Sequence, residues 1–187
     1  MKTLRTIVLL AVVSMMLVSV ANAQSPKIGV YFGPDQVSST NVVPNNTFKI
    51  WVKLAEITGD VNAVEYKLTL PAGVIVLDYT YYGDDPIVFG SAAEGVAVGF
   101  GECAPMFPGN PEFETLLVAE LTAMSLTTFS ATPVTITRFE GNPQSPSTAP
   151  RFSDCDGVLF DLAVENGTLL ASVGVESTSF GAVKALY

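Results

Sequence analysis

The chain of 187 residues has 9 Lys and Arg against 18 Asp and Glu, a formal net charge of −9, and no histidine. The negative charge argues against nucleic acid as a partner, because binding to phosphates depends on clustered cations. Without histidine, a catalytic triad built on an imidazole base is excluded.

Residues 1–23 are predicted to be a secretory signal peptide. Lys2 and Arg5 precede an apolar run from Ile7 to Val20, and the small residues "ANA" follow as a cleavage site. The run of about 14 residues is shorter than the roughly 20 that a transmembrane helix needs. We expect a secreted mature chain that begins at Gln24, is extracellular, at the cell surface or periplasmic, and has no stable membrane insertion; a retained membrane anchor is the alternative.

Cys103 and Cys155 are the only two cysteines of the chain, and we predict a disulfide bond between them because an exported protein meets an oxidising compartment. The bond would close a loop of about 53 residues and contribute about 4 kcal/mol in the chain-entropy model. Two free thiols or an intermolecular bridge are the alternatives. A metal pair would lack histidine ligands and a second cysteine cluster.

Short runs of alternating apolar and polar residues, separated by turn residues, fill the mature chain and indicate strands. The clearest are "TFKIWVKLA" (Thr47 to Ala55) and "AVEYKLTL" (Ala63 to Leu70). No convincing helix precedes the C-terminal tail. About ten strands are predicted in all; the others are Lys27 to Phe32, Val74 to Tyr79, Ile87 to Phe89, Val96 to Phe100, Leu116 to Leu121, Val134 to Phe139, Val158 to Val164 and Thr168 to Ser172.

Turn and loop signals set the expected architecture. Asn166-Gly167 lies between two β-prone runs and predicts a tight hairpin. "GECAPMFPGNPEF" and "EGNPQSPSTAPRFSDCDG" are predicted to be loops, because proline removes a donor from a strand ladder, and each contains one cysteine. The expected fold class is therefore all-β, a two-sheet β-sandwich with long loops at its rim.

The order of these segments resembles a cohesin domain. The similarity is carried by "VPNNTFKIWVKLAEITGDVNAVEYKLTLPAGVIVLDY", "LLVAELTAMSLTTFSATPVTITRFEG" and "GVLFDLAVENGTLLA", and it extends from about Val30 to Val173. It is a similarity of pattern and order more than of diagnostic motif. The resemblance implies a jelly-roll sandwich of nine or so strands, shared with related carbohydrate-binding modules, that binds a protein partner and has no catalytic activity.

The sandwich is expected to occupy residues 24–173, so residues 174–187 form a separate tail. "STSFGAVKALY" resembles short C-terminal segments of secreted bacterial proteins, with Phe180 where such segments have tryptophan. Phe180, Val183 and Leu186 would share one side of a short helix, but about nine residues are too few to hold a helix alone in water. The tail is thus predicted to be a sorting or attachment segment, or a docked or frayed terminus.

Trp51 is the residue that most suggests a binding surface, because it falls on the polar side of its strand between Lys49 and Lys53. An outward aromatic side chain suits a protein partner or sugar stacking. We predict partner binding at Lys49, Trp51 and Lys53. The alternative function is a carbohydrate-binding module that stacks glycans on Trp51 and on Tyr81 or Tyr82. If a neighbouring loop or another sheet edge covers the Trp51 ring, the ring is available neither to a protein partner nor to a sugar.

No catalytic residue is predicted, and no cofactor. Two-carboxylate glycosidase chemistry is a minor alternative, for which the glutamates on or near loops are Glu94, Glu102, Glu112 and Glu114. Calcium is a further candidate, since Asp84-Asp85 and the stretch from Asp154 to Gly157 place carboxylates in turns. The second stretch lacks the later glutamate of a calcium loop, and Asp and Gly also favour turns for their own sake.

Overall fold

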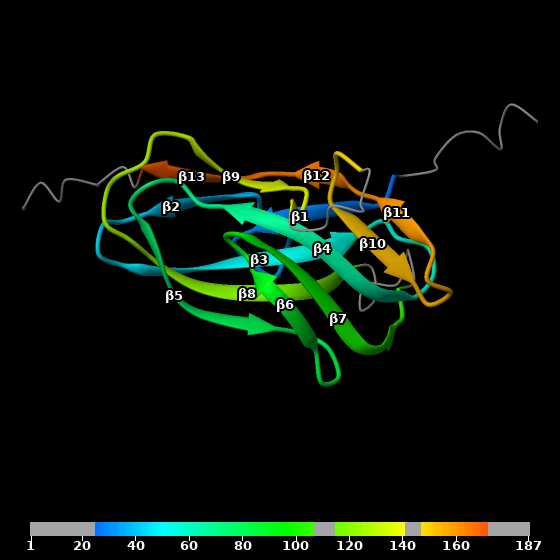
Figure 1. Cartoon of the computed structure of the whole chain (residues 1–187). Coiled ribbons are helices and arrows are strands. Elements are labelled where there is room, and N and C mark those ends of the chain that lie inside the picture. The colour runs from blue at the N-terminus through cyan, green and yellow to red at the C-terminus, as the bar shows by residue number, and fades with distance from the viewer. Residues whose placement is uncertain (1–24, 107–114, 141–146, 172–187) are drawn as a thin grey trace, which may run out of the picture.

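The computed structural model describes residues 25–106, 115–140 and 147–171, and within these ranges the chain forms thirteen β-strands (Figure 1). This confirms the predicted all-β fold class. None of the described residues forms a helix long and apolar enough to cross a membrane. The predicted signal peptide and the predicted tail lie outside the described residues, and the domain bounds 24–173 stay a prediction.

The strands in chain order are β1 (Lys27–Tyr31), β2 (Ser39–Val42), β3 (Thr47–Ala55), β4 (Val61–Thr69), β5 (Val74–Tyr81), β6 (Ile87–Ser91), β7 (Gly95–Ala104), β8 (Thr115–Ser125), β9 (Thr132–Thr137), β10 (Arg151–Asp154), β11 (Leu159–Asp161), β12 (Ala163–Glu165) and β13 (Gly167–Ala171).

These strands form two sheets. The first has the order β12-β1-β3-β8-β5, and the second runs β11-β10-β4-β9-β13-β2, with β7 added to β4 and β6 added to β7. Most neighbours are antiparallel, whereas β12 on β1 and β13 on β2 are parallel pairs. Figure 1 shows β6 and β7 as a hairpin at the lower front of the molecule, with β10 and β11 at the right-hand end.

The core lies between the sheets and follows the alternation seen in the sequence. In β4, Val64, Tyr66 and Leu68 are buried, while the residues between them are at least partly exposed. Facing them from the first sheet are Ile50 and Val52 of β3, also fully buried. Each such aliphatic side chain contributes about 1.5–3 kcal/mol through burial, so the alternation decides which face of each strand turns inward.

Two predicted loops contain strand residues, which corrects the sequence analysis. Arg151–Asp154 form β10 between β4 and β11, and β7 continues through Cys103 to Ala104. Pro150 and Pro105 stand just outside these strands. Since neither proline occupies a ladder position, the argument from the missing proline donor does not apply to the residues beside them. The polar strand β2 was also not predicted.

The predicted Asn166-Gly167 hairpin is wrong. β12 pairs with β1 in one sheet and β13 with β9 and β2 in the other, so the two residues carry the chain across the sandwich. Neither has a positive φ. Instead, the Asn166 side-chain oxygen accepts a hydrogen bond from the backbone N–H of Ile136 at 3.1 Å, and Gly167 allows close packing because it has no side chain.

The predicted disulfide between Cys103 and Cys155 is confirmed, with 5.9 Å between the two Cα atoms. Cys103 lies near the end of β7 and Cys155 directly follows β10. Their neighbours Ala104 and Asp154 both pair with Val61 at the start of β4. The bond therefore joins the two strands that flank this end of β4.

Removing this crosslink should destabilise the sandwich. We expect the double variant Cys103→Ser/Cys155→Ser to lose about 2–5 kcal/mol of unfolding free energy, because the unfolded chain regains the freedom of the closed loop. Denaturant unfolding followed by circular dichroism measures this. Wild-type protein treated with a reductant is the control and should match the double variant; equal stability of oxidised and reduced protein would contradict the expectation.

Gly167 offers a second test of the packing. A Cβ atom at this position would lie 2.7 Å from Val30 Cγ1 and 2.9 Å from Phe32 Cε2. We therefore expect Gly167→Ala to lower the unfolding free energy by about 1–3 kcal/mol through overpacking. Gly33→Ala is the matched control, since nothing lies within 4 Å of its added Cβ. If both variants unfold at the same denaturant concentration, the close contact is not restrictive.

Candidate functional site

The predicted binding residues Lys49, Trp51 and Lys53 lie on β3 in the first sheet, and two of them are already paired. Lys49 is exposed and forms an ion pair with Glu120 of the neighbouring strand. Lys53 is only 5% exposed and donates a hydrogen bond from Nζ to the backbone oxygen of Pro34 at 2.7 Å. Burial lowers the pKa of Lys53 below its usual value. A partner would meet Lys49 first, and Lys53 hardly at all.

The Trp51 ring is half-buried rather than open. Lys53 Nζ lies over it, 4.9 Å from the ring centroid, a cation–π contact. The indole Nε1 is buried and has no hydrogen-bond partner among the described residues. One face of the ring therefore already contacts a cation where a sugar would stack.

The structure separates Trp51 from Tyr81. Trp51 pairs with Glu120 and Tyr81 with Ala119, and consecutive residues of a strand point to opposite faces of the sheet. Tyr81 instead stacks on Tyr79, with ring centroids 6.3 Å apart. Tyr82, the other tyrosine of the glycan alternative, is 36% exposed.

The outer face of the second sheet is a surface that the sequence analysis missed. Val64, Val98 and Phe152 point into the core, so the residues next to them point outward. The pairing of five adjacent strands, β6, β7, β4, β10 and β11, aligns these outward residues in two rows. One row is Phe89, Ala97, Glu65, Arg151 and Asp161, and the other is Ile87, Gly99, Ala63, Ser153 and Leu159. We call these ten positions the five-strand face.

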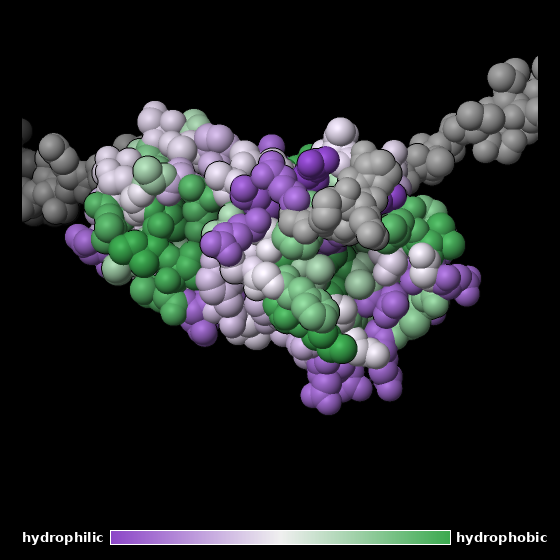
Figure 2. All heavy atoms as spheres, viewed as in Figure 1, coloured by the Kyte–Doolittle hydropathy of each residue, from purple (hydrophilic) through white to green (hydrophobic). Residues whose placement is uncertain are grey.

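Large apolar side chains stand at both edges of the five-strand face. Ile87 and Phe89 on β6 are 57% and 66% exposed, and Leu159 on β11 is 51% exposed. Figure 2 shows hydrophobic surface over β6 and again near β10 and β11, with pale and hydrophilic residues between them. Small residues fill the middle of the second row, above a shallow hollow of about 90 Å³. The face is thus low in its centre and apolar at its edges.

The charged residues of the five-strand face lie together in the first row. Arg151 Nε is 3.0 Å from Asp161 Oδ1, and Arg151 stands between Asp161 and Glu65 in the register. Three charged side chains of alternating sign therefore follow one another from β4 to β11. This arrangement gives the face a fixed polar side next to its apolar row.

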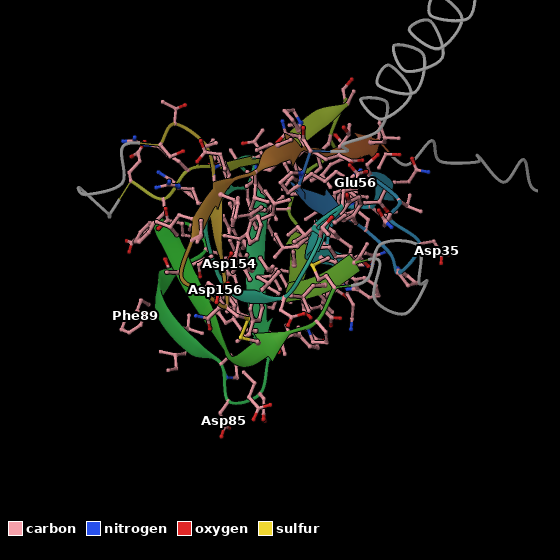
Figure 3. The ribbon with its side chains drawn as sticks, turned by 90° about the vertical axis from the view of Figure 1, so that its right-hand side faces the viewer. Asp35, Glu56, Asp85, Phe89, Asp154 and Asp156 are labelled. Atoms are coloured by element: carbon pink, nitrogen blue, oxygen red, sulfur yellow. A yellow bond between two sulfur atoms is a disulfide. The ribbon has the colours of Figure 1, made fainter. Side chains whose placement is uncertain are left out.

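A larger cavity of about 560 Å³ opens at the end of the sandwich that carries the disulfide. Its walls include the stacked rings of Phe152 and Phe160 and the carboxylates of Glu56, Asp60, Asp154 and Asp156. Figure 3 shows Asp154 and Asp156 beside the disulfide and Asp85 on a separate loop. Among the described residues, no three carboxylates or cysteines stand close enough to hold a metal ion.

The two described carboxylates that were considered for catalysis are also far apart. Glu94 lies in the turn before β7 and Glu102 near the other end of that strand, eight residues away. An extended strand rises about 3.3 Å per residue, which separates these two positions by roughly 26 Å, whereas a glycosidase pair needs about 5–10 Å. Glu112 and Glu114 lie outside the described residues.

Comparisons with known proteins agree with the fold. No protein-family model and no curated protein matches the sequence. Among solved structures, the chain is similar to a non-cellulosomal cohesin from Archaeoglobus fulgidus, at 13% identity and a TM-score of 0.53, covering 88% of this chain and 100% of that one. It is also similar to a cohesin module of a family 33 glycoside hydrolase from Clostridium perfringens, at 11% identity and a TM-score of 0.52, covering 79% and 98%.

A third similar structure is the third ScaB cohesin of R. flavefaciens in complex with a group 1 dockerin, at 10% identity and a TM-score of 0.51, covering 81% of this chain and 98% of that one. The chain has a cohesin-like β-sandwich fold. This confirms the resemblance found in the sequence as far as the fold is concerned. At identities this low, the likeness of this cohesin-like chain to those modules extends to the fold alone.

The absence of a cofactor stays a prediction, and calcium is its alternative; at Asp154 the turn geometry argues against a calcium site. Its Oδ1 accepts hydrogen bonds from the backbone N–H groups of Asp156 at 3.0 Å and Val158 at 2.8 Å, so the turn itself uses this carboxylate. We expect millimolar calcium to change the melting temperature no more than magnesium does. Differential scanning calorimetry with calcium, with magnesium and with chelator measures this; a rise specific to calcium would show a site.

Proposed function

We propose that this chain is a secreted, non-catalytic module that binds a protein partner, and that the five-strand face is its docking surface. The observation that supports it is the row of Ile87, Gly99, Ala63, Ser153 and Leu159, in which large exposed side chains flank small ones. Apolar surface of this kind is costly to leave in water and is typical of a recognition site.

The dimensions of this face suit a folded partner. Five strands at about 4.8 Å spacing place β6 and β11 roughly 19 Å apart, which is wide enough to seat a helix or a strand pair between them. The small residues in the centre allow the backbone of a partner to approach closely. Phe89 and Leu159 would then pack against its sides, each contributing about 1.5–3 kcal/mol on full burial.

The charged side chains beside the apolar row would provide specificity. Glu65, Arg151 and Asp161 already contact or neighbour one another, so a partner with complementary polar groups gains orientation without leaving a charge unpaired. Interfaces commonly combine an apolar centre with such a polar margin. The net charge of −9 favours a partner that is less acidic than this chain.

The wider context supports a binding role. The fold is that of cohesin modules, and one similar structure is described as a cohesin in complex with a dockerin. We extend that only to a protein partner and to no particular dockerin. The Cys103–Cys155 disulfide suits an oxidising compartment, which supports the predicted export of the chain. Enzyme activity is not part of the proposal, because the sequence has no histidine and its described loop glutamates stand apart.

Partner capture can test the five-strand face against the residues predicted from sequence. The protein is immobilised, proteins from the culture medium of the organism that encodes it are passed over it, and the affinity of each captured partner is measured by calorimetry. We expect the double variant Phe89→Ala/Leu159→Ala to weaken binding about 10- to 100-fold, because it removes both apolar edges.

Two controls make the result specific. Leu77→Ala removes a side chain of similar exposure, 52%, from β5 in the other sheet, and should leave the affinity unchanged. Trp51→Ala tests the predicted patch of Lys49, Trp51 and Lys53. Loss of binding in Trp51→Ala, with full binding in the Phe89→Ala/Leu159→Ala variant, would move the site to the first sheet and refute the proposed one.

A further inference from the structure

β6 is an edge strand with unusual exposure. It pairs only with β7 among the described strands, so its other side carries unpaired backbone groups. Ile87, Val88 and Phe89 are 57%, 36% and 66% exposed, and no residue of β6 is charged. Natural edge strands are normally protected by charge, proline, bulges or a covering segment, because they otherwise pair with other chains. In β6 the open segment is Ile87 to Phe89, because Pro86 precedes the strand and Gly90 has a positive φ of 86°.

We infer that β6 pairs with β6 of a second copy of this chain, antiparallel and centred on Val88, to form a two-fold symmetric dimer. In this register Val88 faces the partner's Val88, and Ile87 faces the partner's Phe89. Both faces of the joined strands then carry apolar cross-strand pairs, which are favourable in antiparallel sheets. The strand is therefore complementary to itself, as a two-fold interface requires.

Charge is arranged so that this pairing meets no repulsion. The acidic residues next to β6 are Asp84 and Asp85 on one side and Glu94 on the other. Asp84 and Asp85 lie outside β6, before Pro86, and Asp85 has a positive φ of 48°, so neither continues the paired segment. No acidic residue faces another, although the chain as a whole carries a net charge of −9.

The other edge strands do not share this self-complementarity. β5 has a register shift between Val76 and Asp78. Pairing β11 with itself about its middle residue would place Leu159 opposite the partner's Asp161, and the same operation on β12 would place Ala163 opposite the partner's Glu165. β2 is mostly polar. Among the edge strands that the structure describes, β6 is the one with apolar residues on both faces and no charge.

The dimer would have a consequence for binding. Directly opposed residues of an antiparallel pair point to the same side of the sheet, so both five-strand faces would lie on one side of a continuous sheet. A partner with two binding segments could then engage both faces and gain avidity. The dimer itself does not depend on the proposed function, since it needs only this chain.

Analytical ultracentrifugation of the purified chain over a range of concentrations tests the inference. We expect the wild-type protein to sediment with twice the mass of one chain, and Ile87→Lys/Phe89→Lys to sediment as a monomer. Leu159→Lys is the matched control, because it adds a lysine at a similarly exposed site on β11 and should stay dimeric. A wild-type monomer at every concentration, or dissociation of Leu159→Lys as well, would overturn the inference.

A crosslinking experiment checks the register and does not require disruption of the strand. Both native cysteines are already bonded to each other, so Val88→Cys adds the one free thiol. We expect mild oxidation to give a covalent dimer of Val88→Cys and none of Leu159→Cys. Equal crosslinking of the two variants, or none in either, would count against pairing at Val88. Melting curves of all variants confirm that each is folded.

Partner binding and dimer formation are separable in these experiments. A partner that binds the monomeric Ile87→Lys/Phe89→Lys variant at full affinity would refute the five-strand face while leaving the dimer intact. A wild-type monomer that still loses its partner in Phe89→Ala/Leu159→Ala would refute the dimer and leave the docking surface intact.

Discussion

The pairing of β4 with strands on both of its edges is the constraint on which the rest of this structure depends. Its first residue, Val61, pairs with Ala104 of β7 and with Asp154 of β10, and the disulfide joins the residues next to those two. The later part of β4, from Lys67 to Thr69, pairs with β9. Because side chains alternate along β4, the register also determines which residues of β6, β7, β10 and β11 point into the core. It likewise determines which of them line the five-strand face.

The sequence predicts those parts of the fold that depend on local alternation. β3 and β4 were predicted with nearly their observed bounds, because each has an apolar residue at every second position and one face against the core. β2 was missed because its four residues are mostly polar, and β10 because its four residues lie in a stretch rich in proline and serine. The disulfide was predictable from chemistry alone, since two cysteines in a chain that is predicted to be exported favour a bond with each other.

Other features depend on contacts between distant residues and are invisible to local patterns. Asn166-Gly167 has the composition of a hairpin turn, yet Gly167 is needed because Val30 and Phe32 approach it closely. Trp51 falls on the polar side of its strand as predicted, but a register shift follows Val52, and Lys53 folds back over the ring. The rows of the five-strand face join residues from Ala63 to Asp161, and only the register brings them together.

The exposed apolar edge of β6 and the high negative charge of the chain act over different distances. At physiological ionic strength, repulsion between exposed charges is screened beyond about 8 Å, so two acidic copies can approach each other. When two copies touch, the charged and apolar residues of the strands that meet determine whether pairing is favourable. An approach through β5 or β11 brings a carboxylate against an apolar residue or another charge, and desolvation of that carboxylate opposes it. An approach through β6 meets no such group, so the charge of the surrounding surface selects this edge by disfavouring the others.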